Sequence, residues 1–405
     1  MRYERPELTA PAGDWSALKS AAIAGADSVY FGVKDLNMRH QAGNFDVLEL
    51  GKIMDLLREK GMKGYLTLNV IVFDREMDKV RSILDHAVKA GVDAVILWDM
   101  AVLEEARKLG LKVHLSTQAS VSNYEALKHY SSLGVKRAVL ARECTLSDIK
   151  SITKRIGEEK LDLSIETFIH GAMCVSISGR CFMSEDTFGK SANRGECIQP
   201  CRREFRITDM DDDTSYVIGR DYVLSPKDLC TVGILDRLIE AGINAFKIEG
   251  RIRSPEYVKE VTTVYREAID AYFDNTLNDD LKNSLYGRLK RMYNRGFSEG
   301  FYLGRPDEWV SGRLENEYEK VFLGEVVKFY KKINVAEILI RNEGIRKGQQ
   351  ILINGKTTPA SFARVDELEQ DHRPVDFAPR GETVAIKLPF TARPKDQAYI
   401  WQKKS

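Results

Sequence analysis

The stretch that decides the fold is Gly64–Trp98, GYLTLNVIVFDREMDKVRSILDHAVKAGVDAVILW. It begins with an apolar run that predicts a strand over residues 64–71, continues with a helical period over 75–90, and ends with a second apolar run over 94–98. The Ala90–Gly91 pair between helix and strand is typical of a helix C-cap, where glycine readily adopts a left-handed backbone. Two apolar strands joined by a helix of this length predict a parallel β-α-β unit.

The same alternation of strand and helix recurs along the first two-thirds of the chain. Eight such units over roughly 270 residues match the usual size of a (β/α)8 barrel. We therefore predict an α/β fold of this TIM-like type, with a doubly wound open sheet as the alternative. The predicted strands are Leu8–Pro11, Ser28–Phe31, 64–71, 94–98, Lys112–Ser116, Arg137–Leu140, Leu163–Ile169 and Ala245–Ile248, and the predicted helices are 14–25, 47–60, 75–90, 100–109, 122–133, 145–157, 226–241 and 255–274.

The pattern of the sequence changes after about residue 300. Residues 301–319 are typical of a linker, and apolar alternation with a period of two follows over 320–405. Short strands separated by turn signals such as Asn354–Gly355 predict a small antiparallel β-barrel. The expected domains are a barrel over 1–300, with a cysteine-rich insertion at about 170–226, and this C-terminal β-barrel.

Composition excludes several classes of protein. The chain has 405 residues, with 61 Lys and Arg against 60 Asp and Glu, and therefore a net charge of +1. Hydrophobic residues make up 43% and charged residues 30%, which excludes global disorder. No apolar run approaches the ~20 residues of a membrane span, and the N-terminus lacks the apolar core of a signal peptide, so we expect a cytoplasmic protein with no membrane contact. Near-neutral charge also excludes a protein that coats nucleic acid through bulk charge, but it leaves room for a local basic groove.

Four of the six cysteines lie on one long connection, between the strand ending near Ile169 and the helix expected from residue 226. With six, fifteen and three residues between neighbours, they are Cys174, Cys181, Cys197 and Cys201. Because the connection follows a barrel strand, we expect it on the carboxyl-terminal face, where such barrels build active sites. Four thiolates on one loop suit tetrahedral zinc or an iron–sulfur cluster, although the spacing departs from the paired knuckles of structural zinc. The alternative is a set of buried thiols, which is the interpretation preferred for Cys144 and Cys230; Cys230 could also substitute for a ligand.

The cysteine loop and the strands around it carry a set of motifs: Glu166-Thr-Phe-Ile-His-Gly-Ala-Met-Cys174, Gly179-Arg-Cys181-Phe-Met-Ser184, Ser191-Ala-Asn-Arg-Gly-Glu-Cys197-Ile-Gln-Pro-Cys201-Arg, Lys247-Ile-Glu-Gly-Arg251 and Leu8-Thr-Ala-Pro-Ala-Gly13. Together they resemble the U32 peptidase family, through the barrel and more loosely into the C-terminal domain. Several members of that family are prephenate-dependent RNA hydroxylases that act on the tRNA wobble uridine or on an rRNA cytidine. The resemblance implies a 4Fe–4S cluster held by the four cysteines of the loop, and prephenate as a co-substrate.

The family name also implies a collagenase-like peptidase, for which the residues speak weakly. The sequence contains no His-Glu-x-x-His motif of a metalloprotease and no Gly-x-Ser-x-Gly elbow. A cysteine peptidase needs a thiolate beside a histidine, and His170 lies four residues before Cys174, which keeps that alternative open.

Polar residues at the expected strand ends are candidates for the active site. Because prephenate is a dicarboxylate, we expect guanidinium groups to pair with it, foremost those of Arg39, Arg142 and Arg251. The expected catalytic residues include Glu166 and His170 as proton carriers near the cluster. The alternative for each residue is a salt bridge or hydrogen bond that only closes the barrel. In full, the predicted catalytic residues are Glu166, His170 and Glu249, and the predicted substrate-binding residues are Arg39, His40, Asn69, Asp99, Gln118, Arg142 and Arg251.

RNA is the expected partner, and a paralogous protein partner is left open. Residues 282–295 contain five cations, two tyrosines and no acid, a pattern that suits phosphate contacts and base stacking. The alternatives are a solvated helix face and, for the whole chain, a zinc-stabilised RNA-binding module without chemistry. The predicted RNA-binding residues are Arg194, Arg202, Arg203, Lys282, Arg288, Lys290 and Arg291.

Overall fold

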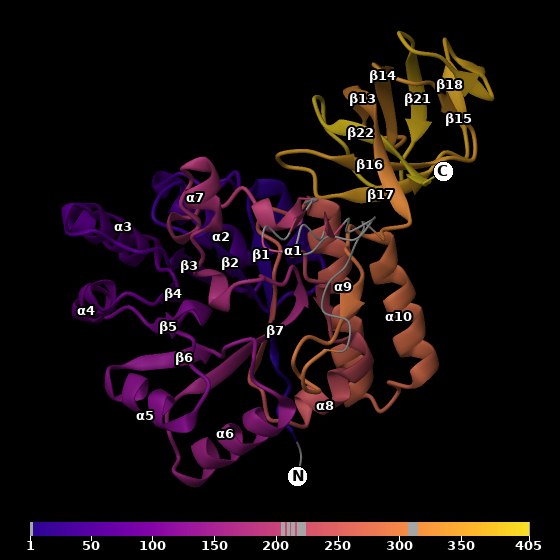
Figure 1. Cartoon of the computed structure of the whole chain (residues 1–405). Coiled ribbons are helices and arrows are strands. Elements are labelled where there is room, and N and C mark those ends of the chain that lie inside the picture. Colours follow the sequence, from indigo (N-terminus) through magenta and orange to yellow (C-terminus); the bar gives the residue numbers. More distant parts are fainter. Residues whose placement is uncertain are drawn as a thin grey trace.

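The computed structural model describes residues 3–203, 207–208, 211, 215–216, 224–306 and 315–404 of the chain. The amino-terminal two-thirds of the chain closes into a barrel, and the remainder forms a curled antiparallel sheet beside it (Figure 1). Among the described residues, no helix combines the length and the apolar character that crossing a bilayer requires.

Eight parallel strands close the barrel, which confirms the predicted TIM-like fold and excludes the open doubly wound sheet. Seven strands pair in chain order, and the eighth pairs with both the seventh and the first, so that the barrel wall has no open edge. Their side chains are almost all buried, as expected for strands covered by side chains within the barrel and by helices outside it. The strands are β1 (Glu7–Ala12), β2 (Ser28–Phe31), β3 (Lys63–Leu68), β4 (Ala94–Leu97), β5 (Val113–Leu115), β6 (Val135–Val139), β7 (Ser164–Gly171) and β11 (Ala245–Ile248).

Helices follow the strands and cover the outer wall of the barrel. Side-chain caps fix the starts of α1, α4, α5 and α6; the carboxylate of Asp14 and the amide oxygen of Asn123, for example, each accept a hydrogen bond from a first-turn backbone N–H. The expected glycine cap is also present, because Gly91 ends its helix with a φ of 68°. These helices are α1 (Trp15–Ile23), α2 (Leu50–Glu59), α3 (Met77–Ala90), α4 (Met100–Lys108), α5 (Tyr124–Ser132), α6 (Leu146–Glu158) and α9 (Pro255–Phe273).

The prediction of one helix over 226–241 is wrong for its first half. The chain instead forms a strand, β10 (Asp228–Cys230), and only then a short helix, α8 (Leu235–Ile239). β10 forms because the last two residues of β7 extend past the end of its neighbour β6 and pair with β10 antiparallel, while β12 (Phe297–Ser298) pairs with the other edge of β10. Cys230 is therefore a buried strand residue, and its burial raises the pKa of its thiol to about 12.

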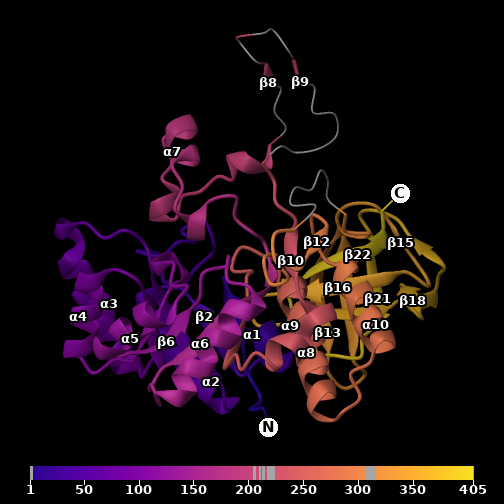
Figure 2. The same ribbon diagram turned by 60° about the horizontal axis from the view of Figure 1, so that its bottom comes forward.

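The cysteine loop leaves the carboxyl end of β7, as its position after a barrel strand predicts. It contains α7 (Met183–Phe188) and a short hairpin of β8 (Ile207–Thr208) and β9 (Ser215–Tyr216). In Figure 2, α7 rises from one end of the barrel, clear of the helices that surround the wall. The loop thus lies over the barrel mouth.

The last part of the chain is a curled sheet of eight antiparallel strands, with two further short strands paired beside it. Alternate residues of its long strands fill a separate apolar core, as the period of two predicts. Residues 307–314, within the predicted linker, lie outside the described residues. Following α10 (Asp279–Arg291), the strands are β13 (Tyr318–Tyr330), β14 (Val335–Ile340), β15 (Ile345–Arg346), β16 (Gln350–Asn354), β17 (Ser361–Arg364), β18 (Leu368–Gln370), β19 (Arg373–Pro374), β20 (Phe377–Ala378), β21 (Thr383–Lys387) and β22 (Gln397–Lys403).

Charged side chains fill the barrel near its amino-terminal end. Both carboxylate oxygens of Glu7 accept hydrogen bonds from the guanidinium of Arg137, at 2.8 and 3.1 Å, and the Tyr65 hydroxyl donates at 2.6 Å. Burial opposes ionisation of Glu7, but these donors and the charge of Arg137 outweigh it, so the pKa of Glu7 lies well below its usual range. Glu7 is therefore a largely buried anion whose charge is matched by the buried Arg137 and by the exposed Lys63, whose ammonium lies 2.9 Å from Oε2.

We expect Glu7→Gln to lower the free energy of unfolding at pH 7 by about 3 kcal/mol, because it leaves Arg137 buried beside a neutral amide. Since the folded-state pKa is depressed, the stabilisation by Glu7 is complete above the unfolded value of about 4 and is lost as the pH falls below it. Urea unfolding of both proteins from pH 7 to pH 3 should show the difference shrinking with acid. The matched control is Glu4→Gln, at an exposed position. A difference that is undiminished at pH 3 would contradict this account.

Candidate active site

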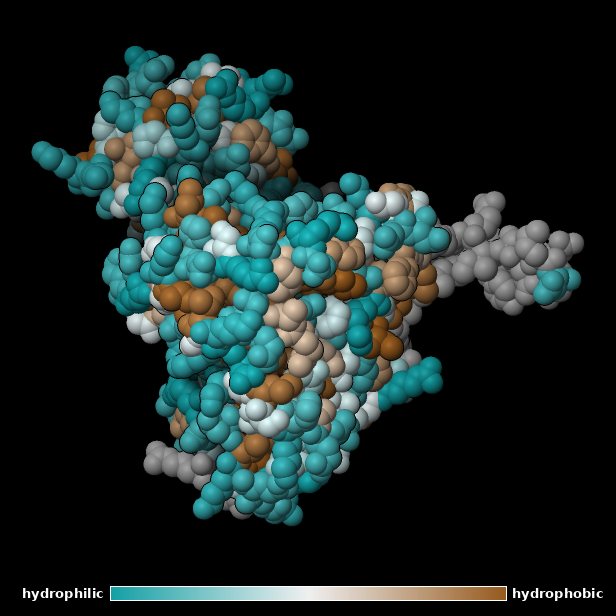
Figure 3. Space-filling view, turned by 90° about the vertical axis from the view of Figure 1, so that its left-hand side faces the viewer, coloured by the Kyte–Doolittle hydropathy of each residue, from teal (hydrophilic) through white to brown (hydrophobic). Residues whose placement is uncertain are grey.

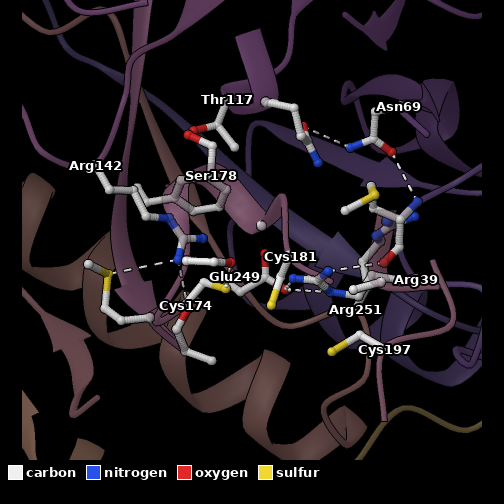
Figure 4. Close-up of a pocket in the computed structure, with 18 of the residues that line it drawn as sticks. Arg39, Asn69, Thr117, Arg142, Cys174, Ser178, Cys181, Cys197, Glu249 and Arg251 are labelled. Carbon is white, nitrogen blue, oxygen red and sulfur yellow. Dashed lines mark hydrogen bonds and ion pairs between the residues drawn. The ribbon is translucent and has the colours of Figure 1, made fainter. Parts of the chain in front are cut away.

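A pocket of about 290 Å³ opens at the carboxyl ends of the barrel strands, beneath the cysteine loop. Its floor is built by residues at or just beyond the ends of β3, β5, β7 and β11, and the loop supplies one wall. Figure 4 shows Glu249 at the centre of the pocket, with Arg39 and Arg251 on one side and Arg142 on the other. The structure thus brings the three arginines expected to bind substrate to one place.

Glu249 is held as an anion in this pocket. Arg39 donates to Oε1 of Glu249 from Nε at 3.2 Å and from Nη2 at 3.0 Å. Burial opposes ionisation of Glu249, but the charges of Arg39, Arg142 and Arg251 outweigh it and lower its pKa. A carboxylate with a lowered pKa is a weak proton acceptor, so its contacts suit it to orienting Arg39.

The other two arginines differ in how fully they are already bonded. Arg251 is 4% exposed, and its Nη1 donates to Asn37 at 3.0 Å and to Thr67 at 2.8 Å. Burial lowers its pKa to about 10, at which the guanidinium is still charged at neutral pH. The Nη1 of Arg142 donates to the backbone oxygen of Ala172 at 2.9 Å, whereas its Nε is buried without a partner among the described residues. Arg142 therefore has donor capacity left for a ligand.

The pocket lining is strongly cationic. Within the described part of the chain, the lining contains six basic side chains and two acidic ones, and neither histidine nor aspartate. A concave site with this excess of guanidinium groups suits an anionic ligand, and carboxylates in particular. The basic residues are Arg39, Arg142, Arg202, Lys247, Arg251 and Arg253, and the acidic ones are Glu143 and Glu249.

All four cysteines of the loop line this pocket, and none forms a disulfide. Burial raises the pKa of Cys197 and of Cys201, while the charges of Arg39 and Arg202, respectively, oppose that shift. The Cys174 thiol lies 3.0 Å from the Ser176 hydroxyl. Among the described residues, no three His, Cys, Asp or Glu side chains are arranged to hold a metal ion. The four thiols share one wall, and they would have to move toward one another to bind a common metal centre.

Two amides predicted to bind substrate also reach the pocket. Asn69 accepts a hydrogen bond from the backbone N–H of Met38 at 3.2 Å and donates to Ser116 at 3.3 Å. Gln118 lies beside it, and its side-chain oxygen accepts from the Ser116 hydroxyl. Both side chains are nearly buried, so their polar atoms face a confined space.

Two other predicted substrate-binding residues do not line the pocket. The carboxylate of Asp99 turns back to cap α4, accepting from the backbone N–H of Ala101 at 2.9 Å and of Val102 at 3.2 Å. His40 is exposed and is engaged through its backbone, whose N–H donates to the Gly195 oxygen at 3.1 Å and whose oxygen accepts from the Asn44 amide at 3.3 Å. These two residues stabilise a helix and a loop, respectively.

Glu166 and His170 also lie outside the pocket lining. Glu166 is fully buried inside the barrel, where its Oε2 lies 3.4 Å from the Lys247 ammonium. His170 is 2% exposed and sits among the rings of Tyr257, Tyr265 and Phe297. Burial, helped by the charge of Arg253, lowers its pKa to about 3. The side chain of His170 therefore lies in an aromatic core, outside the pocket that the four loop thiols line.

The predicted RNA-binding residues are scattered. Only Arg202 lines the pocket, where it donates to the Met173 carbonyl at 2.6 Å, and Arg203 is exposed beside it over the Phe188 ring. Arg194 is bonded to both carboxylate oxygens of Glu76.

The four predicted residues on α10 lie away from the pocket, on a helix packed against α9 (Figure 1). Lys282 binds Asp236 at 2.8 Å and Arg288 binds Glu260 at 2.8 Å, so both tie α10 to its neighbours. Lys290 and Arg291 lie over tyrosine rings. Half of this predicted surface is thus engaged in ion pairs.

Sequence reasoning missed two groups of residues. Lys247 and Arg253 line the pocket, and Lys247 carried a signal in that it lies two residues before Glu249 on the same strand. The loop also presents Ile177 and Phe182 at its surface, 62% and 72% exposed. Brown apolar patches interrupt the hydrophilic surface on the side of the molecule that carries α3, α4 and α7 (Figure 3). Large apolar residues beside a cysteine in a glycine-rich loop could have been noted as candidates for contact with a partner.

Comparison with known proteins identifies relatives of two kinds. An "uncharacterized protease" of Methanocaldococcus jannaschii is 41% identical, over 97% of this chain and 98% of the relative, and a "collagenase" of Porphyromonas gingivalis is 38% identical over 98% of both. A "tRNA hydroxylation protein P1" of Bacillus subtilis is 33% identical over 86% of this chain and 83% of the relative. The model of peptidase family U32 matches residues 13–311. This chain therefore belongs to the U32 peptidase family.

Proposed function

We propose that this protein hydroxylates a pyrimidine base of RNA, with prephenate as the oxygen donor. The observation that carries the proposal is the composition of the pocket: six basic side chains and four cysteines, with no histidine or aspartate among the described lining residues. Such a lining suits an anionic co-substrate and a metal centre better than it suits hydrolysis of a peptide bond. The name of the B. subtilis relative supports the same reaction class. A cytoplasmic location is part of this proposal.

In this proposal the arginines bind the two carboxylates of prephenate. Arg142 has a buried Nε without a partner among the described residues, and Arg39 and Arg251 lie on the other side of Glu249 (Figure 4). Glu249 fixes the guanidinium plane of Arg39, so that this arginine meets the ligand without first being ordered. Asn69 and Gln118 add neutral hydrogen-bonding groups for the remaining oxygens.

The RNA base would enter from the rim formed by the cysteine loop. Phe182 is exposed there, and Arg180 and Arg203 are exposed on the same loop. Aromatic rings stack on unpaired bases, and guanidinium groups contact phosphates, so this rim suits a single-stranded or flipped-out nucleotide. This rim fits the substrate better than α10, whose Lys282 and Arg288 are held in ion pairs.

The four cysteines fit a 4Fe–4S cluster by their chemistry. They are four reduced, partly buried thiols on one wall, which is the ligand set that such a cluster takes. Bound by Cys174, Cys181, Cys197 and Cys201, the cluster would supply one-electron redox chemistry at the pocket. Zinc in the same ligands is the alternative.

A peptidase is the second candidate, because the P. gingivalis relative named collagenase matches along the whole chain. The described residues provide little of the chemistry that peptide hydrolysis requires. A cysteine peptidase requires a histidine beside the thiolate, and His170 is instead buried among three aromatic rings with its pKa lowered to about 3. Glu249, the central carboxylate, is neutralised by arginine.

The proposed function is tested by nucleoside mass spectrometry of tRNA and rRNA from cells that lack this protein. We expect a hydroxylated uridine or cytidine to be absent, to return with the wild-type protein, and to depend on a supply of prephenate. Unchanged RNA, together with hydrolysis of gelatin or unfolded collagen by the purified protein, would favour the peptidase.

Metal and sulfide analysis of anaerobically purified protein tests the cluster. We expect about four irons and four sulfides per chain in the wild type, and loss of both in Cys197→Ala. Cys144→Ala is the matched control, because Cys144 is a buried thiol outside the pocket and should leave the metal content unchanged. One zinc per chain without sulfide would exclude the cluster and favour the zinc-stabilised module.

Calorimetric titration with prephenate tests the arginines. Arg142→Gln removes a charged donor and should weaken prephenate binding about tenfold or more. Arg142→Lys should have an affinity between those of the wild type and Arg142→Gln, because lysine keeps the charge but cannot pair bidentately. Arg107→Gln on α4 is the control, since it changes the same net charge at an exposed position outside the pocket. Equal losses in Arg142→Gln and Arg107→Gln would show that only the overall charge matters.

A further inference from the structure

Lys247 lies at the floor of the arginine-lined pocket. It projects from β11 into the barrel, is 4% exposed, and belongs to the pocket lining. Its Nζ lies 4.3 Å from the centroid of the Tyr30 ring and 3.4 Å from Oε2 of Glu166. The side chain thus places an amine in the lining of a cavity that also holds five arginines.

The contact with Glu166 is a poor reason for burying a lysine. A well-formed ammonium–carboxylate hydrogen bond is roughly 2.7–2.9 Å long, so 3.4 Å is a loose contact. The other carboxylate oxygen, Oε1 of Glu166, is buried without a partner among the described residues. A purely structural ion pair would satisfy these groups more completely, and it would not need access to a pocket.

The surroundings of Lys247 favour its neutral amine. Burial lowers the pKa of Lys247, the nearby charge of Arg137 acts in the same direction, and Glu166 and Glu249 oppose the shift. Each unit by which the pKa falls leaves about tenfold more neutral amine at neutral pH. A desolvated lysine with a lowered pKa is the form of this side chain that attacks carbonyl groups.

We propose that Lys247 forms an imine with the carbonyl carbon of a 2-oxo acid whose carboxylate is held by the arginines of the pocket. The two groups together define the ligand class, because guanidinium groups select the carboxylate and the amine selects the neighbouring carbonyl. The inference rests on the proposed function in one respect: it takes the pocket to be the site of a carboxylate-bearing co-substrate. It adds a covalent contact to that site.

The step balances without an oxidant or reductant. Lys247 first passes its ammonium proton to Glu166, and the free amine attacks the carbonyl carbon, so that a C–N bond forms as the C=O π bond opens. Proton transfer from nitrogen to oxygen gives a carbinolamine. Loss of the C–O bond, with the proton returned from Glu166, releases one water and leaves a protonated imine. The Glu166 carboxylate, freed again, lies beside this new cation and stabilises it.

Tyr30 does not supply the proton in this scheme. Its hydroxyl donates to the backbone oxygen of Ile248 at 2.9 Å, and burial raises its pKa well above the usual value. The Tyr30 ring instead faces the nitrogen and can stabilise a positive charge there. Glu166 is therefore the group in hydrogen-bond contact with Lys247 that can accept and return the proton.

Borohydride trapping tests the inference on the intact wild-type protein. Incubation with pyruvate, the simplest 2-oxo acid, and then with sodium borohydride should reduce the imine to a stable secondary amine. We expect one modified peptide containing Lys247, heavier by the mass of the acid less one oxygen atom. Lactate, which has the carboxylate but no carbonyl, should give none. Absence of the pyruvate adduct, or equal labelling of exposed lysines, would overturn the proposal.

Two variants separate chemistry from folding. Lys247→Arg keeps a cation at the floor and should abolish trapping, while Lys259→Arg should leave it intact. Lys259 is the matched control because burial also lowers its pKa, but it lies outside the pocket and donates to the Ala360 oxygen at 2.9 Å. Mass spectrometry locates the adduct directly in the wild-type protein. The inference is therefore decided by that measurement even if Lys247→Arg does not fold.

RNA analysis distinguishes this inference from the proposed function. A pyruvate adduct at Lys247 without any RNA hydroxylation would support the imine and overturn the hydroxylase. Full RNA hydroxylation by folded Lys247→Arg would support the hydroxylase and overturn the imine, because the reaction would then proceed without the covalent contact.

Discussion

A charge buried inside the barrel requires an opposite charge beside it, and the rest of the structure depends on how these charges are matched. Arg137 neutralises Glu7 near the amino-terminal end, through two hydrogen bonds. Lys247 faces Glu166, and it pairs with Thr9, two residues after Glu7 on β1. These side chains are mostly shielded from water, so an unmatched ion there would be costly.

The match becomes looser toward the mouth of the barrel. The lower pair is bidentate and close, the middle pair has one contact of 3.4 Å, and in the upper layer Glu249 faces more than one arginine. Positive charge therefore accumulates where solvent and ligands have access. Near the amino-terminal end of the barrel the charges are matched within the protein, which stabilises the fold. At the mouth, excess positive charge remains, and a bound anion can neutralise it. The stability of the barrel and the anion-binding site thus have one origin, because ion pairing inside the barrel becomes less complete toward its mouth.

The sequence predicts the barrel well because the signal is local and repeated. Apolar runs, helical periods and glycine caps such as Gly91 each depend only on nearby residues. The strand β10 could not be predicted in this way, since Asp228–Cys230 pairs with the part of β7 that continues beyond β6. The choice between helix and strand was made there by a neighbour more than fifty residues away.

The same limit explains which site residues were predicted. Asn69, Gln118 and Arg251 follow barrel strands, and that position alone brings them to the mouth. Asp99 has the same position, but the free N–H groups at the start of α4 capture its carboxylate. His170 is also at a strand end, yet the packing of Tyr265 and Phe297 encloses it. Strand position predicts where a residue is, whereas contacts with distant elements determine which way its side chain faces.

The cysteine wall and the pocket behave as one unit because the loop is bonded to the barrel at several points. Asn193 accepts from the backbone N–H of Cys181 at 3.0 Å, and its own backbone oxygen accepts from Ile71 at 3.3 Å. At Gly195, with a φ of 87°, a Cβ atom would lie 2.2 Å from the Asn37 oxygen, so only glycine allows the loop to approach this closely. Asn37 also accepts from Arg251. A metal that drew the cysteines together would therefore pull on the same residues that position the anion-binding arginines, which couples the state of the loop to the geometry of the pocket.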